Sequence, residues 1–275
     1  MQKTILITGS TDGIGLETAK LLAAAGHNVL LHGRNPDKLA KAAKALSALT
    51  KGGSVETYQA DLSRMADVEA LAEAVTRQHA RLDVLINNAG VYRTPEPVTA
   101  DGLDIRFAVN TIAPCLLTRR LLPLMQASGR VINLSSAAQA PVDPQALAGK
   151  TALSDGAAYA QSKLALTMWS RSLGLQLKGQ GPVVVSVNPG SMLGSKMVKE
   201  AFGVAGGDLA IGADILRRAA LDTEFAAASG LYFDNDSGRF ADPHPDALDP
   251  RKSGEIVDLV DLIISKLTQE QEQDR

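Results

Sequence analysis

Two side chains in the segment YAQSK could together perform acid–base chemistry. Tyr159 and Lys163 are four positions apart, so on a helix they lie on one face, one turn from each other. A free tyrosine, with a pKa of about 10, is a poor base at neutral pH, but a neighbouring positive charge favours the phenolate and lowers that pKa. The pair is therefore a candidate proton donor and acceptor. The alternative is that the two side chains lie on a solvated helix face and have no catalytic role.

A glycine-rich segment near the N-terminus has the composition of a phosphate-binding loop. Gly9, Gly13 and Gly15 follow a short β-rich run and precede a helical pattern, with the spacing G-x-x-x-G-x-G. Glycines allow a tight turn and a close approach of the backbone to a ligand. The N-terminus of the following helix offers a phosphate its free N–H groups and the positive end of its dipole. The alternative is an ordinary turn between a strand and a helix.

The end of the second expected strand indicates which dinucleotide such a loop would bind. An NAD site of this kind usually has an acidic residue about 20 residues beyond the glycines, where it binds the ribose 2′-hydroxyl. This region reads LLHGRN and contains no acid, and Arg34 stands just beyond the strand. A guanidinium suits a 2′-phosphate, so the sequence favours NADP(H) over NAD(H). The alternative for Arg34 is a solvated loop residue.

Strand and helix patterns alternate along the chain and would position these residues. Strands are expected at 4–8, 28–33, 54–61, 82–90, 129–136, 181–190 and 230–235. Helices are expected at 13–26, 34–49, 65–78, about 101–126 and 158–177. Several strands are apolar on both faces, as in a parallel sheet covered by helices on each side. The order predicts an α/β fold: a single doubly wound Rossmann domain with a seven-stranded parallel sheet.

Further motifs stand in the order found in short-chain dehydrogenases/reductases. They are TGSTDGIG at 8–15, ADL at 60–62, NNAG at 87–90, Asn110, NLSS at 133–136, YAQSK at 159–163 and NPG at 188–190. The chain resembles this family over 3–235, and its long connection from Ser136 to Tyr159 resembles that of retinol-dehydrogenase-like members. The resemblance implies an oxidoreductase that interconverts a small-molecule carbonyl and an alcohol by hydride transfer with a nicotinamide cofactor.

The resemblance also assigns roles to individual residues. Tyr159 would be the acid in reduction and the base in oxidation. Lys163 and the positive nicotinamide of the oxidised cofactor would lower its pKa, and Lys163 would hydrogen-bond the nicotinamide ribose. Ser136, rather than Ser135, would donate to the substrate oxygen, and Asn110 would hold a water that links Lys163 to solvent. The cofactor-binding positions that it implies are Gly9, Ser10, Thr11, Gly13, Ile14, Gly15, Arg34, Asn35, Asp61, Leu62, Asn87, Ala89, Gly90, Tyr159, Lys163, Pro189, Gly190 and Met192.

Two local features refine these roles. Pro114 lies four residues after Asn110 and has no N–H, so the Asn110 carbonyl would lack its helix donor and could accept from water. The alternative is a kinked core helix. Where the family often has a Thr that contacts the nicotinamide, this chain has Gly194, and its hydroxyl comes one position later at Ser195.

The chain is expected to divide at about residue 235 into a catalytic domain and a short C-terminal part. Residues 1–235 would form the catalytic domain, with a substrate-covering segment at about 191–222, and 236–275 a connector and a helix. That helix carries one apolar stripe and would pack on the domain or on a partner subunit. The stripe consists of Ile256, Leu259, Val260, Ile263 and Leu267. The resemblance implies a homodimer or homotetramer that uses the helices beginning near Asp101 and Ala157.

Composition excludes several other classes. The net charge is −2 without a cationic cluster, so neither nucleic acid nor a membrane surface is expected as a partner. Four scattered histidines and the single Cys115 predict no metal site and no internal disulfide. No apolar run could span a bilayer and none near the N-terminus suits a signal peptide, so a cytoplasmic protein is expected. The alternative function is a cofactor-binding sensor or scaffold without turnover.

Overall fold

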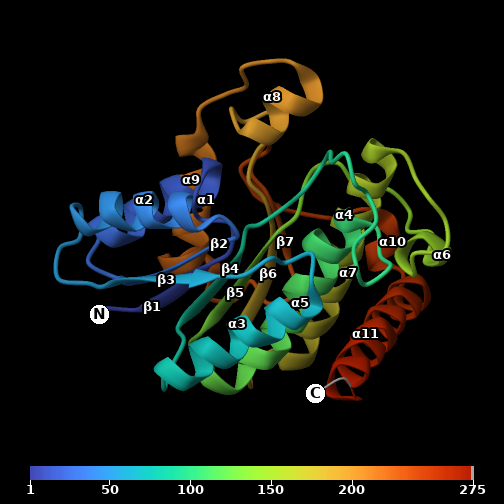
Figure 1. Ribbon diagram of the computed structural model, residues 1–275, viewed down its shortest axis with the longest axis horizontal. Helices are drawn as coiled ribbons and strands as arrows, with labels where there is room; N and C mark the ends of the chain where they lie inside the picture. The colour runs from blue at the N-terminus through green and yellow to red at the C-terminus, as the bar shows by residue number, and fades with distance from the viewer. Residues whose placement is uncertain (274–275) are drawn as a thin grey trace.

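A single twisted β-sheet forms the centre of the molecule, and the helices pack on it. In the computed structural model, which describes residues 1–273, the strand order is β3-β2-β1-β4-β5-β6-β7-β8 (Figure 1). The strands are β1 Thr4–Ile7, β2 Asn28–Gly33, β3 Val55–Gln59, β4 Val84–Asn87, β5 Arg130–Leu134, β6 Val183–Asn188, β7 Tyr232–Asp234 and β8 Arg239–Ala241. Strands β1 to β7 pair in parallel, and β8 pairs antiparallel with β7.

The predicted α/β Rossmann fold is confirmed, with one strand more than expected. The extra strand β8 is three residues long and returns along β7 after a turn that contains Gly238 at φ 69°. A strand this short has too few residues for its alternation of polar and apolar side chains to be recognised. The sequence therefore predicted the parallel part of the sheet and missed its antiparallel edge.

Helices cover both faces of the sheet. On one face lie α1 Gly13–Ala24, α2 Pro36–Ser47 and α9 Leu209–Leu221, and on the other α3 Met65–Gln78, α5 Ala113–Leu121 and α7 Asp155–Leu177 (Figure 1). The short helices are α4 Ile105–Phe107, α6 Pro144–Leu147, α8 Lys196–Phe202 and α10 Pro245–Leu248, and the last helix is α11 Pro250–Gln273. Within residues 1–273, no helix is both long enough and apolar enough to cross a membrane.

The central strands are apolar on both faces because each face has its own core. Ile5 and Ile7 of β1 pack with α1, α2 and α9, whereas Leu6 between them packs with α3, α5 and α7. All three side chains are fully buried. Alternate side chains of a strand point to opposite faces, so a doubly covered sheet requires continuous apolar runs.

The helix expected at about 101–126 is broken in the structure, which corrects that prediction. Asp104 accepts a hydrogen bond from the Arg106 N–H and starts α4 at Ile105. A π-helical turn at Ala108–Ile112 then precedes α5, closed by the Ala113 N–H donating to the Ala108 carbonyl. Pro114 supplies no N–H to the preceding turn, which accounts for the wider turn around Asn110.

The C-terminal helix α11 packs along α7 on the outside of the molecule (Figure 1). Val260 is fully buried, and Ile256 is only 4% exposed. Asp261 of α11 pairs with Arg119 of α5, whose guanidinium also lies 5.9 Å from the centroid of the Trp169 ring. Helix α11 therefore covers part of the surface of α5 and α7 on which the resemblance places subunit contacts.

We expect this docking to contribute measurably to stability. Replacing Ile256 by Ala removes a buried side chain and should lower the free energy of unfolding by about 2–4 kcal/mol. Leu262 lies on the same helix but is 50% exposed, so Leu262→Ala should cost no more than about 0.5 kcal/mol. Urea denaturation of the three proteins measures the difference, and equal losses would show that α11 does not bury this face in solution.

Candidate active site

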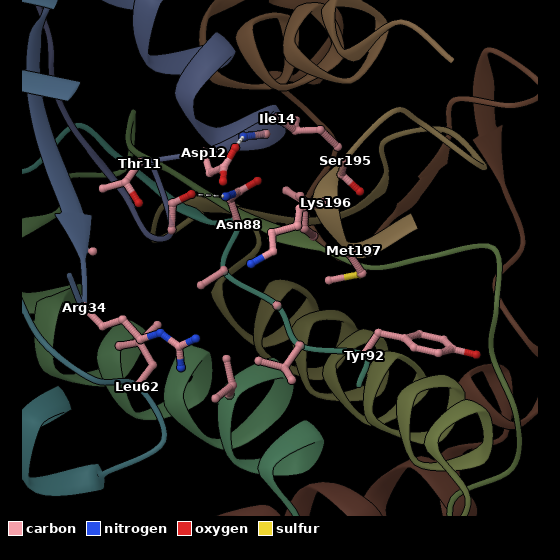
Figure 2. Close-up of a pocket in the computed structure, with 18 of the residues that line it drawn as sticks. Thr11, Asp12, Ile14, Arg34, Leu62, Asn88, Tyr92, Ser195, Lys196 and Met197 are labelled. Atoms are coloured by element: carbon pink, nitrogen blue, oxygen red, sulfur yellow. Dashed lines mark hydrogen bonds between the residues drawn. The ribbon is translucent and has the colours of Figure 1, made fainter. Parts of the chain in front are cut away.

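A cavity of about 430 Å³ opens at the carboxyl ends of the parallel strands. From β1 the chain proceeds to β2 and β3 on one side and then returns to β4 on the other side of β1. The loops after neighbouring strands therefore diverge at this point, where open α/β sheets usually bind their ligands. Figure 2 shows Arg34 and Tyr92 at opposite ends of the cavity, with Thr11, Asp12 and Ile14 along one wall.

The glycine loop after β1 needs its glycines because the backbone runs against the end of β4. A Cβ on Gly9, which has φ +64°, would lie 2.9 Å from the Ala89 Cα. A Cβ on Gly15 would lie 2.4 Å from Asn88 Nδ2. That amide donates to the carbonyl oxygens of Thr8 and Gly9 at 2.9 and 3.0 Å, which fixes the loop on β4.

The loop presents the N-terminus of α1 to the cavity. The Asp12 carboxylate accepts from the Gly13 N–H at 2.8 Å, which satisfies the first free donor of the helix. The next N–H groups, of Ile14 and Gly15, have no acceptor within the helix, as in every first helical turn. Gly13 and Ile14 line the cavity, so this wall can bind an anion.

Two basic side chains lie at the end of the cavity beside β2. Arg34 follows β2 and extends toward the cavity (Figure 2). Lys38, in the first turn of α2, lines the same wall and pairs with Asp12 at 3.4 Å. Helix α2 starts here because Asn35 accepts from the Lys38 N–H at 2.9 Å and Pro36 occupies the first helical position. The end of β2 thus offers a phosphate two cations and one opposing carboxylate.

Lys163 is a buried ammonium. Its side chain projects from α7, is 4% exposed, and donates to the carbonyl of Leu134 at the end of β5 at 2.7 Å. Burial lowers the pKa of Lys163 from 10.5 to about 8, so the ammonium is still mostly protonated at pH 7. Its Nζ lies 5.7 Å from the centroid of the Tyr159 ring, as the four-residue spacing on a helix predicted.

The protein by itself raises the pKa of Tyr159, so the lowered pKa expected with an oxidised nicotinamide beside Lys163 stays a prediction. Burial raises the pKa of Tyr159, a hydrogen bond with Ser136 opposes that rise, and the neighbouring Tyr92 adds to it. The protein around the phenol therefore favours its protonated form at neutral pH. Spacing on a helix indicates that a cation is near, but it does not show how far the surrounding protein removes solvent from the phenol.

The two serines after β5 have different surroundings. The Ser135 side chain points into the core, where its hydroxyl lies 2.6 Å from the Thr167 hydroxyl. Ser136 is partly exposed, accepts from the Ala138 N–H at 3.1 Å and hydrogen-bonds Tyr159. Ser135, and not Ser136, is among the residues that line the cavity, so the choice of Ser136 as the serine that acts with the tyrosine stays a prediction.

The Asn110 side chain holds the loop after β4 above Lys163. Its Oδ1 accepts from the Val91 N–H at 2.8 Å, and its Nδ2 donates to the Val91 carbonyl and to the Ser162 hydroxyl. Gly90 lies between, and a Cβ there would be 3.6 Å from Lys163 Nζ. The Asn110 side chain therefore positions the loop after β4. The main-chain carbonyl of Asn110 is a separate group, to which Pro114 cannot supply the N–H of a regular α-helix.

Ion pairs anchor the N-terminus of α7, the helix that carries Tyr159. Arg106 is 1% exposed and contacts the carboxylates of Asp104 and Asp155 at 2.6 Å each. Asp155, the first residue of α7, also accepts from Arg93 at 3.1 Å. The adjoining Tyr92 packs against Tyr159 with ring centroids 5.0 Å apart. The loop after β4 and the start of α7 thus form one wall of the cavity beside the phenol.

Most of the expected site residues meet on the cavity wall. Those that line it are Gly9, Thr11, Gly13, Ile14, Arg34, Asp61, Leu62, Ala89, Gly90, Tyr159, Lys163 and Pro189. Those that do not are Ser10, Gly15, Asn35, Asn87, Asn110, Ser136, Gly190 and Met192.

Packing explains several of the residues away from the wall. Asn87 is buried and donates to Thr118 and Asn133, which ties β4 to α5 and β5. Ser195, by contrast, lines the cavity: it caps α8 by accepting from the Val198 N–H at 3.2 Å, and its Cβ lies 3.9 Å from where a Cβ on Gly13 would be. The hydroxyl of Ser195 is thus engaged with its own helix.

Sequence reasoning missed several residues of the wall, and Lys38, Asn88 and His32 are three of them. Lys38 had a usable signal, since it lies four positions after Arg34 at the start of a helix with Asn35 as its cap. Asn88 stood inside the recognised NNAG motif, but nothing in the sequence distinguished it from Asn87. His32 gave no signal, because a lone histidine at a strand end is most often a packing residue.

His32 is the most deeply buried titratable group of the glycine-loop wall. It is 3% exposed, its Nδ1 accepts from the Gly9 N–H at 3.1 Å, and its Nε2 lies 3.2 Å from the Ala60 carbonyl. Burial lowers the pKa of His32 from 6.5 to about 4, against a smaller opposing effect of the Ala60 carbonyl and the charge of Asp61. The ring is therefore neutral at pH 7.

This shift predicts a pH dependence of stability. Because the pKa of His32 is lower in the folded protein, the neutral ring contributes its full stability above pH 6.5 and loses it as the pH falls to about 4. Between pH 7 and pH 4 the wild type should lose about 3 kcal/mol of unfolding free energy more than His32→Asn, which cannot titrate there. Urea denaturation across this range measures both curves, and parallel curves would contradict the prediction.

Comparison with known proteins agrees with this geometry. Residues 3–203 match the short chain dehydrogenase family. Retinol dehydrogenase 13 of Homo sapiens is 38% identical over 193 residues, which cover 68% of this chain and 58% of that protein. The chain thus spans about three fifths of the length of the curated relatives that it matches.

Two solved structures have the same fold. An uncharacterized protein from Mycobacterium Paratuberculosis superposes with a TM-score of 0.78 at 26% identity, covering 96% of this chain and 94% of that one. Landomycin C-6 ketoreductase LanV, solved with bound NADP and rabelomycin, superposes with a TM-score of 0.68 at 30% identity, covering 86% of this chain and 95% of that one.

Proposed function

Since the chain belongs to the short chain dehydrogenase family, we propose that it is an NADP(H)-dependent oxidoreductase that interconverts a ketone or aldehyde and its alcohol. The observation that carries this proposal is the arrangement of one cavity. Tyr159 and Lys163 lie at one end of it, with Ser136 hydrogen-bonded to the phenol. Arg34 and Lys38 lie at the other end.

The wall residues fit a nicotinamide dinucleotide. Close approach at Gly9 and Gly15 leaves no room for side chains beside the loop, so backbone donors at the start of α1 can reach a pyrophosphate. Arg34 and Lys38 would bind a 2′-phosphate, because the end of β2 has cations where an NAD site usually has an acid. A solved relative with NADP bound, the ketoreductase LanV, supports the same cofactor.

The phenol of Tyr159 moves the proton in the proposed reaction. A reduced nicotinamide bound beside Tyr159 and Lys163 would supply the hydride for the carbonyl carbon. Tyr159 donates its proton to the carbonyl oxygen as negative charge develops there, and Ser136 stabilises the same oxygen with a hydrogen bond. A tyrosine is already protonated at neutral pH, and burial raises the pKa of Tyr159 further, which suits the direction of reduction. In oxidation the phenolate must form, and the Lys163 ammonium favours it electrostatically.

Lys163 would also bind the nicotinamide ribose and return a proton to the tyrosine. Its ammonium, with a pKa of about 8, can exchange a proton near neutral pH. Pro114 cannot supply the N–H that an α-helix would donate to the Asn110 carbonyl, so this carbonyl could accept from a water at this point. The Asn110 side chain keeps Gly90 and Val91 in place above the ammonium.

The alternative is a sensor or scaffold that binds the cofactor without turnover. Such a protein would have no need for a buried, desolvated lysine beside a tyrosine and a serine, and all three residues are in place here. We also propose that residues 191–222 cover the substrate, since Ser195, Lys196, Met197 and Glu200 line the cavity. Assembly as a homodimer or homotetramer stays a prediction, and α11 already covers part of α5 and α7.

The first test concerns Tyr159. We expect Tyr159→Phe to lower kcat for NADPH-dependent reduction of aldehydes, ketones or quinones by about 10³-fold, because proton donation is lost. The Kd for NADPH should change by less than about threefold. Tyr58→Phe is the matched control, since its hydroxyl contacts Gln78 and His79 far from the cavity. Full turnover by Tyr159→Phe would exclude the phenol as the acid.

The second test concerns the cofactor preference. Arg34→Ala should raise the Kd for NADPH about 10- to 100-fold, the loss of a charge-assisted bond to phosphate, and leave the Kd for NADH nearly unchanged. Arg77→Ala, an exposed arginine on α3, serves as the control. Fluorescence titration measures each Kd. Tighter binding of NADH than NADPH by the wild type would contradict the role of Arg34.

A further inference from the structure

His32 occupies a position on the glycine-loop wall that the proposed chemistry does not use. It lies near the end of β2, directly after Leu31, which is the last residue of β2 that pairs with β1 (its partner is Ile7). The chain of β1 leaves the sheet at this level and turns into the glycine loop. A side chain here can therefore contact both the loop and the end of β3.

The hydrogen bonds of His32 define its tautomer. Nδ1 receives the Gly9 N–H at 3.1 Å, so this nitrogen must carry the lone pair. Nε2 then carries the proton and donates it to the Ala60 carbonyl at 3.2 Å. The main chain of His32 is bonded as well, since its N–H donates to the Ser10 hydroxyl and its carbonyl accepts from the Ser10 N–H. If the ring were protonated, Nδ1 would also carry a hydrogen, and this N–H would point at the Gly9 N–H with no acceptor between the two donors.

The group that His32 holds is the first glycine of the loop. Gly9 packs against Ala89, and its carbonyl accepts from Asn88, so its other side faces β4. Gly9 is thus fixed between β4 and the imidazole. A Cβ on Gly15 would lie 2.5 Å from the Gly9 oxygen, so a shift of Gly9 also displaces the start of α1. On the other side of the ring, Ala60 precedes Asp61 and Leu62, which line the cavity.

We propose that neutral His32 is a positioning residue that holds Gly9 in register with the end of β3 and thereby sets the affinity for the adenosine-phosphate half of the cofactor. This inference rests on the proposed function. The imidazole acts through the Gly9 N–H, which it keeps directed away from the ligand, and through the α1 donors that follow. The nicotinamide half, beside Tyr159 and Lys163, has its own supports in Asn110 and Ser136.

Three substitutions at His32 test the Nδ1 and Nε2 hydrogen bonds of the ring separately. His32→Asn can place an amide oxygen where Nδ1 stands and keep an acceptor for Gly9. His32→Gln can place an amide NH₂ where Nε2–H stands and keep a donor for Ala60, but it leaves the Gly9 N–H buried without an acceptor. His32→Leu removes both. The probes are NADPH, adenosine 2′,5′-bisphosphate for one half of the cofactor, and reduced nicotinamide mononucleotide for the other.

We expect His32→Gln and His32→Leu to raise the Kd for NADPH and for adenosine 2′,5′-bisphosphate about tenfold or more, the effect of one unsatisfied buried donor. His32→Asn should stay within about threefold of the wild type. The Kd for the mononucleotide should not change in any variant. Equal losses in His32→Asn and His32→Gln, or an equal loss for both halves, would overturn the proposal, because general destabilisation affects all probes alike.

A second measurement does not depend on the variants folding. ¹⁵N-histidine NMR of the wild type, with the ring assigned through the His32 backbone resonances, should show His32 as a neutral Nε2–H tautomer at pH 6. A charged His32 or an Nδ1–H tautomer would contradict the inference. Failure of the wild type to bind NADPH would instead contradict the proposed function, and the tautomer would show whether His32 still holds the loop.

Discussion

A buried lysine ammonium constrains the organisation of the site. Taking a charge out of water is costly, and among the described residues no carboxylate compensates Lys163. One carbonyl at the end of β5 accepts its hydrogen bond, so α7 must lie where β5 ends. Gly90 lies beside the ammonium, where an added Cβ would be 3.6 Å from Lys163 Nζ, and Asn110 holds the adjoining Val91 by accepting from its N–H. Three features of the fold hold this buried ammonium in place. They are the order of the strands, the break in the helix before α5 and the loop after β4.

The opposite end of the cavity is organised by backbone contacts instead of charge. Gly9 and Gly15 allow the glycine loop to touch the end of β4, and Asn88 and His32 hold the loop from two sides. A loop held in this way presents the N–H groups of α1 to a phosphate without rearrangement. Preorganised donors bind an anion more strongly than mobile ones because no conformational entropy is lost on binding. The rigid loop and the buried lysine are thus two independent supports for the two halves of one elongated ligand.

The electrostatic state of Tyr159 depends on both supports. A phenol is protonated at neutral pH and burial raises the pKa of Tyr159 further, so a positive charge must approach it before a phenolate becomes stable. The Lys163 ammonium is 5.7 Å from the ring centroid, close enough to interact but not to remove the effect of burial. An enzyme built in this way would store its proton on the tyrosine in the ground state of reduction. The ion pairs of Asp155 with Arg93 and Arg106 keep the phenol at a fixed distance from the loop after β4.

The sequence by itself determined the fold class, because continuous apolar strands alternating with amphipathic helices have few packing solutions. It also determined the Tyr159–Lys163 pair and the glycine turn, since each depends on residues that are near in sequence. Tertiary structure decided what depends on residues far apart. Asn88 and not Asn87 faces the loop, His32 pins Gly9 across two strands, α11 covers α7, and burial raises the pKa of Tyr159. Desolvation and long-range hydrogen bonds exist only once the sheet has formed, so no local spacing could encode them.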